Sequence, residues 1–129
     1  MATIFTQIVK GEIPAFKIAE DEDFLAFLDI MPLAKGHTLV IPKKEVDYIF
    51  DIDDDLLSRM HVFAKQVAKK IEKAIHCERI GVSVIGLEVP HAHIHLIPIN
   101  SLEDMNFSKP KLKLEQEELK SIADRINAN

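Results

Sequence analysis

The spacing of hydrophobic positions changes several times along the chain, and each change marks an expected element. From Thr3 to Lys10 the apolar residues recur at helical spacing, which predicts a short amphipathic helix. Two β-rich segments follow, Phe16–Glu20 and Phe24–Ile30, with three acidic residues at 21–23 between them. This pattern predicts a hairpin whose turn faces solvent.

The remaining segments give a third strand, a long helix, two more strands and a terminal helix. His37–Pro42 is a β-rich run that follows a glycine. From Asp53 to His76 the apolar residues recur every three or four positions, which predicts one long helix packed against a sheet. Further strands are expected over Arg79–Ile85 and Val89–Pro98, and a C-terminal helix is expected from about Leu114 onward.

The order of these elements predicts an α+β fold. Strands joined mainly as hairpins, with helices grouped beside them, favour an antiparallel five-stranded sheet with one long helix packed on it and short helices near both ends. A chain of 129 residues can bury one core without disulfides. We therefore expect a single domain over residues 1–129.

Composition and charge restrict the classes of partner. Hydrophobic residues make up 47% of the chain and charged residues 29%, with a net charge of −5. An acidic protein has no chain-wide basic field, so we expect neither nucleic acid nor a membrane as a partner, and expect a small anionic ligand to be bound locally. The sequence shows no signal-peptide pattern and no long apolar stretch, so a cytoplasmic location is expected.

Three of the six histidines lie at positions 91, 93 and 95. Because side chains alternate along a strand, His91, His93 and His95 are expected on one face, and the apolar residues between them are expected to face the core. Such a cluster of imidazoles on one strand calls for a chemical explanation.

Three explanations are open at this point. One is an exposed strand face that happens to be rich in imidazole. Another is a metal site. His91 and His95 would lie about 13 Å apart along a strand, so the three histidines could not readily bind one ion together. Two of them could bind it with a further ligand such as His37. The third is nucleophilic catalysis at phosphorus. There one imidazole attacks, and its neighbours, protonated or donating an N–H, stabilise the phosphate oxygens.

The residues around the cluster resemble the signature of a known family. The segment Val89–Pro98 reads VPHAHIHLIP, which is similar to the motif of the histidine-triad (HIT) nucleotide hydrolases and transferases. The resemblance extends over earlier segments: Ile4-Phe5, Gly11–Pro14, Leu25–Ile30 and Gly36–Pro42. It therefore covers most of the chain and implies a HIT-like fold.

The resemblance implies a role for each matching residue. His93, the middle histidine, matches the nucleophile that becomes nucleotidylated, and His91, His95 and His37 match the histidines around the phosphate. Asp29 matches the acid that binds the ribose hydroxyls, where a carboxylate can accept two hydrogen bonds from a cis-diol. The apolar walls around the base are matched by Ile4, Phe5, Ile8, Phe27 and Ile30.

The implied function is cleavage at the α-phosphate of a nucleoside phosphoramidate, acyl nucleotide or related conjugate, with release of a nucleoside monophosphate. The expected ligand is a purine nucleotide or nucleotide conjugate, with no cofactor, and the protein is expected to form a homodimer whose sheet continues across the two subunits. A nucleotide-binding or scaffold protein with little turnover is the alternative.

Three departures from the family pattern bear on these expectations. Thr3 and Thr6 stand where some relatives carry zinc-binding cysteines, so we expect no metal. The hairpin Val82–Gly86 is short and lacks the Asn and extra Gly common in relatives. Leu87 stands where many relatives carry a Gln near the scissile phosphate, so leaving-group stabilisation is expected to be weaker or to come from another residue.

Overall fold

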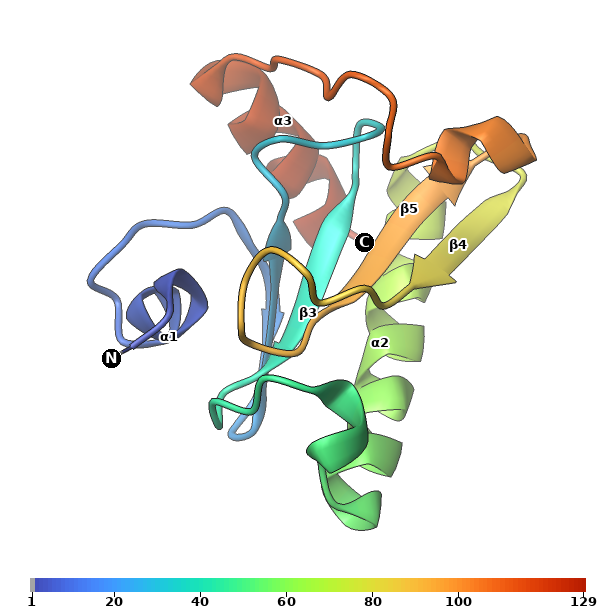
Figure 1. Ribbon diagram of the computed structural model, residues 1–129. Coiled ribbons are helices and arrows are strands. Elements are labelled where there is room, and N and C mark those ends of the chain that lie inside the picture. Colours follow the sequence, from blue (N-terminus) through green and yellow to red (C-terminus); the bar gives the residue numbers. More distant parts are fainter. Residues whose placement is uncertain (1) are drawn as a thin grey trace.

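Five antiparallel strands form one sheet in the computed structural model, which describes residues 2–129 (Figure 1). The strands are β1 (Lys17–Glu20), β2 (Phe24–Leu28), β3 (Thr38–Pro42), β4 (Arg79–Ser83) and β5 (Ile94–Ile99). Their spatial order is β1-β2-β3-β5-β4, with every neighbouring pair antiparallel. The α+β prediction with a five-stranded antiparallel sheet is therefore confirmed.

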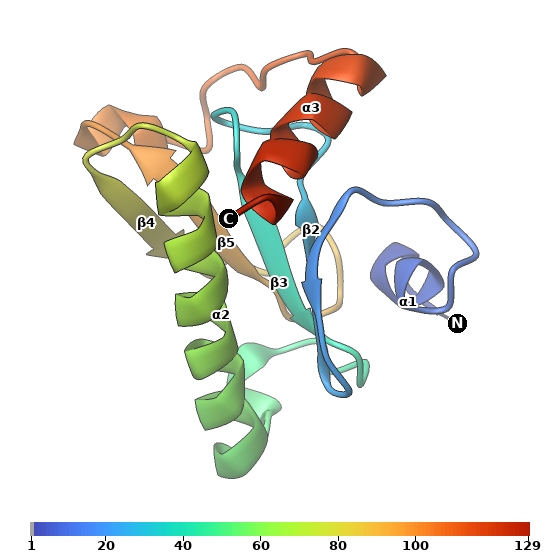
Figure 2. The same ribbon diagram turned by 180° about the vertical axis from the view of Figure 1, so that it is seen from behind.

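Helices cover both faces of this sheet. The long helix α2 (Asp54–Ala74) and the C-terminal helix α3 (Gln116–Asn127) lie against one face, and the short helix α1 (Ile4–Val9) lies on the other (Figure 2). Two 3₁₀ turns, η1 (Ile49–Asp51) and η2 (Leu102–Met105), complete the structure. No helix within residues 2–129 has both the length and the apolar character needed to cross a membrane.

The two faces of the sheet bury separate apolar clusters. The larger cluster lies under α2 and α3, and its most completely buried members include Phe24, Met60, Ile71, Ile94 and Ile126. The smaller cluster lies under α1 and consists of Phe5, Ile8, Leu25, Phe27, Leu39 and Ile41. Alternate residues of β2 and β3 thus face opposite sides of the sheet. Two members of the smaller cluster, Phe5 and Leu39, line the cavity described below.

The strand expected over Val89–Pro98 is shorter in the structure and begins at Ile94. Pro90 has no backbone N–H for a sheet, and the next two N–H groups bond elsewhere. The N–H of His91 donates to the Val89 carbonyl at 2.8 Å, and that of Ala92 to the Val46 carbonyl at 2.7 Å. The first two histidines of the motif therefore lie in the loop that enters β5.

Candidate active site

The motif histidines face the side of the sheet covered by α1. His95 lies on β5 opposite Leu39 of β3, and Leu39 belongs to the smaller cluster. The intervening residues, Ala92, Ile94 and Leu96, are buried in the larger cluster on the opposite face, as the alternation predicted. His37 directly precedes β3, so neighbouring strands bring it beside His95 although 58 positions separate them.

His93 is held in one tautomer by the backbone. Its Nδ1 lies 2.8 Å from the carbonyl oxygen of His91, and a carbonyl can only accept a hydrogen bond. Nδ1 therefore carries the proton in the neutral ring, and Nε2 keeps a free lone pair. The Phe5 ring packs against the His93 ring in a T-shaped arrangement, with 5.1 Å between the centroids and 81° between the planes, and this contact helps to orient the His93 ring. This arrangement is suited to a nucleophile.

His91 is fully buried and does not line the cavity; its ring hydrogen-bonds to other elements and holds the loop in place. Its Nε2 donates to the Pro42 carbonyl at 2.8 Å, so its Nδ1 accepts from the Thr3 hydroxyl at 3.0 Å. Thr6 donates to the Glu45 carboxylate, which also accepts from the Thr3 backbone N–H at 3.0 Å. Burial lowers the pKa of His91. The ring thus ties α1 and β3 to the backbone that positions His93.

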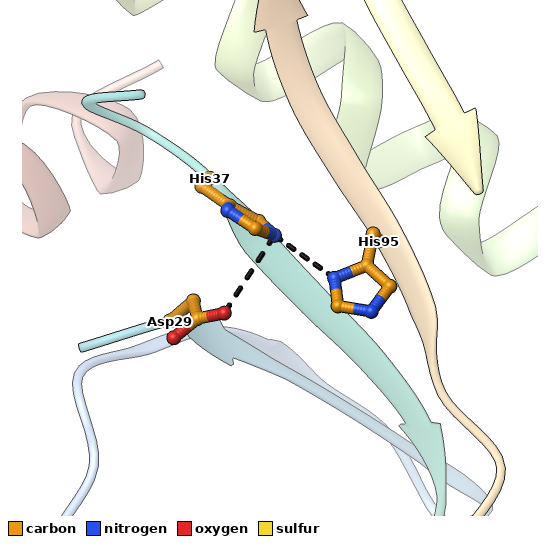
Figure 3. Close-up of side chains that lie close together, drawn as sticks. All are labelled: Asp29, His37 and His95. Atoms are coloured by element: carbon orange, nitrogen blue, oxygen red, sulfur yellow. Dashed lines mark hydrogen bonds and ion pairs between the residues drawn. The ribbon is translucent and has the colours of Figure 1, made fainter. Parts of the chain in front are cut away.

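Asp29, His37 and His95 lie close together beside His93 (Figure 3), and the His95 and His93 ring centroids are 4.9 Å apart. The Leu33 N–H donates to His37 Nδ1 at 3.0 Å, so the neutral His37 ring carries its proton on Nε2. That Nε2 donates to His95 Nδ1 at 2.9 Å, which places the proton of a neutral His95 on its Nε2. The Asp29 carboxylate lies 3.7 Å from His37 Nε2.

Burial determines the protonation of this group. It lowers the pKa of His37 to about 3 and that of His95 to about 4, so both rings are neutral near pH 7. Burial also raises the pKa of Asp29, whereas the Met31 N–H, 2.8 Å from Oδ1, acts in the opposite direction. The sequence left open whether the imidazoles beside the nucleophile are protonated or are neutral N–H donors. The lowered pKa values favour neutral N–H donors.

The same three residues form a group that could hold a metal ion, because one ligand atom from each lies within 4.8 Å of the others. His37, however, has no free lone pair, since its Nδ1 accepts from Leu33 and its Nε2 carries the proton. A cation would have to displace that proton. The group contains His37, the further ligand that the sequence suggested, but only one motif histidine, His95, where the spacing allowed two.

A cavity of about 440 Å³ opens beside these rings, a size typical of small-molecule sites. Its lining residues are Ile4, Phe5, Asp29, Met31, His37, Leu39, Ile85, Gly86, Leu87, Glu88, Val89, His93, His95, Phe107 and Lys111. Leu87 lies in the loop after β4 with 89% of its surface exposed. It offers an apolar edge to the cavity and no hydrogen-bond donor.

The expected site residues are only partly brought together. Ile4, Phe5, Asp29, His37, His93 and His95 line the cavity. Ile8 and Phe27 are buried behind it, where Phe27 supports the Phe5 ring at 5.5 Å between centroids. Ile30 is 58% exposed and does not line the cavity, whereas its neighbour Met31, 51% exposed, does.

Sequence reasoning missed Phe107 and Lys111, which reach the cavity from the segment between η2 and α3. The ring of Phe107 packs against His95 with 4.9 Å between centroids. One signal was present in the sequence: lysines alternate at 109, 111 and 113 in an otherwise acidic chain. No periodic pattern connected them with the histidines, since the contact is tertiary.

Comparison with known proteins identifies the same family that the histidine motif resembles. Residues 10–102 match the family profile of the HIT domain. The chain is 35% identical to adenosine 5'-monophosphoramidase hnt1 of Schizosaccharomyces pombe over 99% of this chain and 98% of that one. It is 41% identical to adenosine 5'-monophosphoramidase HNT1 of Saccharomyces cerevisiae over 75% of this chain and 62% of that one.

A solved structure shares the architecture along nearly the whole length. The crystal structure of a Hit-like protein from Bartonella henselae superposes with a TM-score of 0.85 at 34% identity, covering 98% of this chain and 94% of that one. The profile match spans the histidine motif, and the relative from S. pombe aligns with almost every residue. The chain therefore belongs to the HIT family.

Proposed function

We propose that the protein hydrolyses nucleoside phosphoramidates, acyl nucleotides or related conjugates at the α-phosphate, with His93 as the nucleophile. The observation that carries the proposal is the His93 ring, whose Nδ1 proton is held by the His91 carbonyl while Nε2 remains free beside the cavity. Relatives named adenosine 5'-monophosphoramidases support the substrate class.

The geometry suggests two displacements at phosphorus. His93 Nε2 attacks the α-phosphorus, the P–N or P–O bond breaks with its electron pair on the leaving group, and a nucleotidyl-histidine forms. An amine leaving group takes up a proton from solvent as it departs. The ring gains positive charge in this step, and the His91 carbonyl stabilises it through the Nδ1–H. His95 can donate its Nε2–H to a phosphate oxygen. Water then attacks phosphorus and loses a proton to solvent, the N–P bond breaks with its electron pair returning to His93 Nε2, and a nucleoside monophosphate leaves.

The test is the reaction of purified protein with adenosine 5'-phosphoramidate, followed by chromatography for release of AMP. Acid-quenched samples examined by mass spectrometry during turnover should contain protein carrying one nucleotidyl group. The competing function is a nucleotide-binding or scaffold protein, for which the exposed Leu87 in place of a polar donor is the specific observation. Saturable AMP binding without turnover of phosphoramidate, acyl or ester conjugates would establish that alternative.

Asp29→Ala is expected to weaken AMP binding by about 10- to 100-fold and 2'-deoxy-AMP binding much less, because the lost partner is a ribose hydroxyl. The carboxylate lines the cavity beside the histidines, which supports this role. Calorimetric titration with both nucleotides measures the difference. The exposed Asp51→Ala variant is the matched control. Equal loss for the two sugars would remove Asp29 from the ribose site.

We also propose that two copies pair through the edge strand β4. This strand ends the sheet, and its outer edge has no neighbour within residues 2–129. Val82 on this strand is 59% exposed, and Ile85 in the loop that follows the strand is 44% exposed. An open apolar edge favours pairing with another strand. Sedimentation should show a dimer at micromolar concentration and a shift toward monomer for Val82→Lys. A monomeric parent protein would contradict the proposal.

A further inference from the structure

The segment from Asn106 to Leu112 folds back over the histidines after leaving η2. Figure 1 shows this orange-red segment crossing one end of the sheet on its way to α3. The N–H of Leu112 donates to the Pro32 carbonyl at 2.8 Å, which fastens the segment to the turn that follows Asp29. Phe107 contacts His95, and both Phe107 and Lys111 line the cavity. The fold thus brings a lysine to the histidine cluster.

Lys111 is half-buried and held at two points. Its Nζ donates to the Phe107 carbonyl at 2.7 Å and lies 5.8 Å from the centre of the Phe107 ring. An ammonium has three N–H donors, so two remain for a ligand. Its charge is close enough to contribute to the lowered pKa of His37 and of His95. The lysine therefore presents a fixed positive charge to the cavity.

A positive charge in this cavity would favour the binding of an anionic ligand. Asp29 and Glu88 are the acidic residues of its lining, and Lys111 is the one lysine or arginine there within residues 2–129. His37 and His95 are neutral near pH 7, so neither ring adds positive charge, and the N–H of His37 is already donated to His95. Leu87 supplies no donor. An anionic phosphate bound beside these groups would otherwise meet a negatively charged surface in an acidic protein.

Resting on the proposed nucleotide function, we propose that Lys111 is a substrate-binding residue whose ammonium binds the anionic oxygens of the α-phosphate. The profile match to the HIT domain ends at residue 102, so this residue lies outside the part of the chain that carries the family pattern. The charge acts on binding of the phosphate and, since negative charge builds on the phosphoryl oxygens during displacement, also on turnover.

The test compares Lys111→Met with Lys113→Met, an exposed lysine two positions further along the same segment. Calorimetric titration with AMP and with adenosine separates the phosphate from the nucleoside. Lys111→Met should weaken AMP binding by about 10- to 100-fold and leave adenosine binding within about twofold. Lys113→Met should change neither, and Lys111→Arg should restore most of the AMP affinity because the charge returns.

Equal weakening of AMP and adenosine would show that Lys111 only holds the segment in place, and unchanged AMP binding would show that it does not meet the phosphate. Either result overturns the inference. If the parent protein binds AMP without hydrolysing any conjugate, the hydrolase proposal fails while a selective loss in Lys111→Met still supports the phosphate contact. A parent protein that binds neither ligand overturns both.

Discussion

His93→Ala should reduce turnover of adenosine 5'-phosphoramidate by about a thousandfold or more, because it deletes the proposed nucleophile. Binding of AMP should stay within several-fold of the parent, since the other cavity-lining residues remain in place. Steady-state rates and calorimetric titration of the same preparations give both quantities. The substitution separates chemistry from binding more cleanly than any other in the site.

Two comparisons make the His93 result decisive. His76→Ala removes an exposed histidine outside the cavity and should keep parental rates. His91→Ala removes the ring that holds the loop before β5, and this loop loses two hydrogen bonds. Because the loop positions His93, the substitution should lower both AMP binding and turnover. A His93→Ala protein that retains activity within tenfold of the parent would exclude His93 as the nucleophile.

The second large effect concerns acid stability. In the unfolded chain His37 and His95 titrate near the ordinary pKa of 6.5, whereas in the folded protein they stay neutral down to about 3 and 4. The unfolded state therefore binds more protons in acid, and the stabilisation present above about pH 6.5 is lost as the pH falls. Each ring contributes a slope of about 1.4 kcal/mol per pH unit between its two pKa values.

The free energy of unfolding should thus fall by about 5 kcal/mol between pH 7 and pH 4.5 from this pair alone. That is a large part of the 5–15 kcal/mol typical of a domain. Urea titrations across this pH range measure the fall. The double variant His37→Gln/His95→Gln keeps all carboxylates. A plot of its unfolding free energy against pH should therefore be shallower than that of the parent by about 2 kcal/mol per pH unit. Parallel curves for parent and variant would show that neither ring resists protonation in the folded state.

The sequence predicted the parts of the fold that depend on short-range patterns. Alternation placed the side chains on either side of β5 correctly, and the 3.6-residue period marked α2, whose N-cap is Asp53 with its side chain accepting from the Leu56 N–H at 2.9 Å. The strand boundary at Ile94 was missed because it depends on where the backbone of His91 and Ala92 finds partners.

Parts of the candidate site could not be predicted for the same reason. Ile8 and Phe27 have the apolar character of pocket walls, but whether such residues line a cavity or lie behind it depends on how α1 docks. The neutral state of His37 follows from burial, which no local pattern reveals. Lys111 lines the same cavity as the histidines, on a segment that a hydrogen bond between residues distant in sequence, from Leu112 to Pro32, ties to the turn after β2.

The hydrogen bond between Thr3 and His91 joins residues 88 positions apart, and this separation has a kinetic consequence. Helix α1 has only six residues, too few to persist alone in water, so it is stable only when docked. Docking requires the loop between the two residues to close, which is slow relative to local structure formation. A chain emerging from the ribosome therefore cannot complete the cavity until β5 and the segment that carries Phe107 and Lys111 have been synthesised. Completion of the cavity is thus expected to be among the last events of folding.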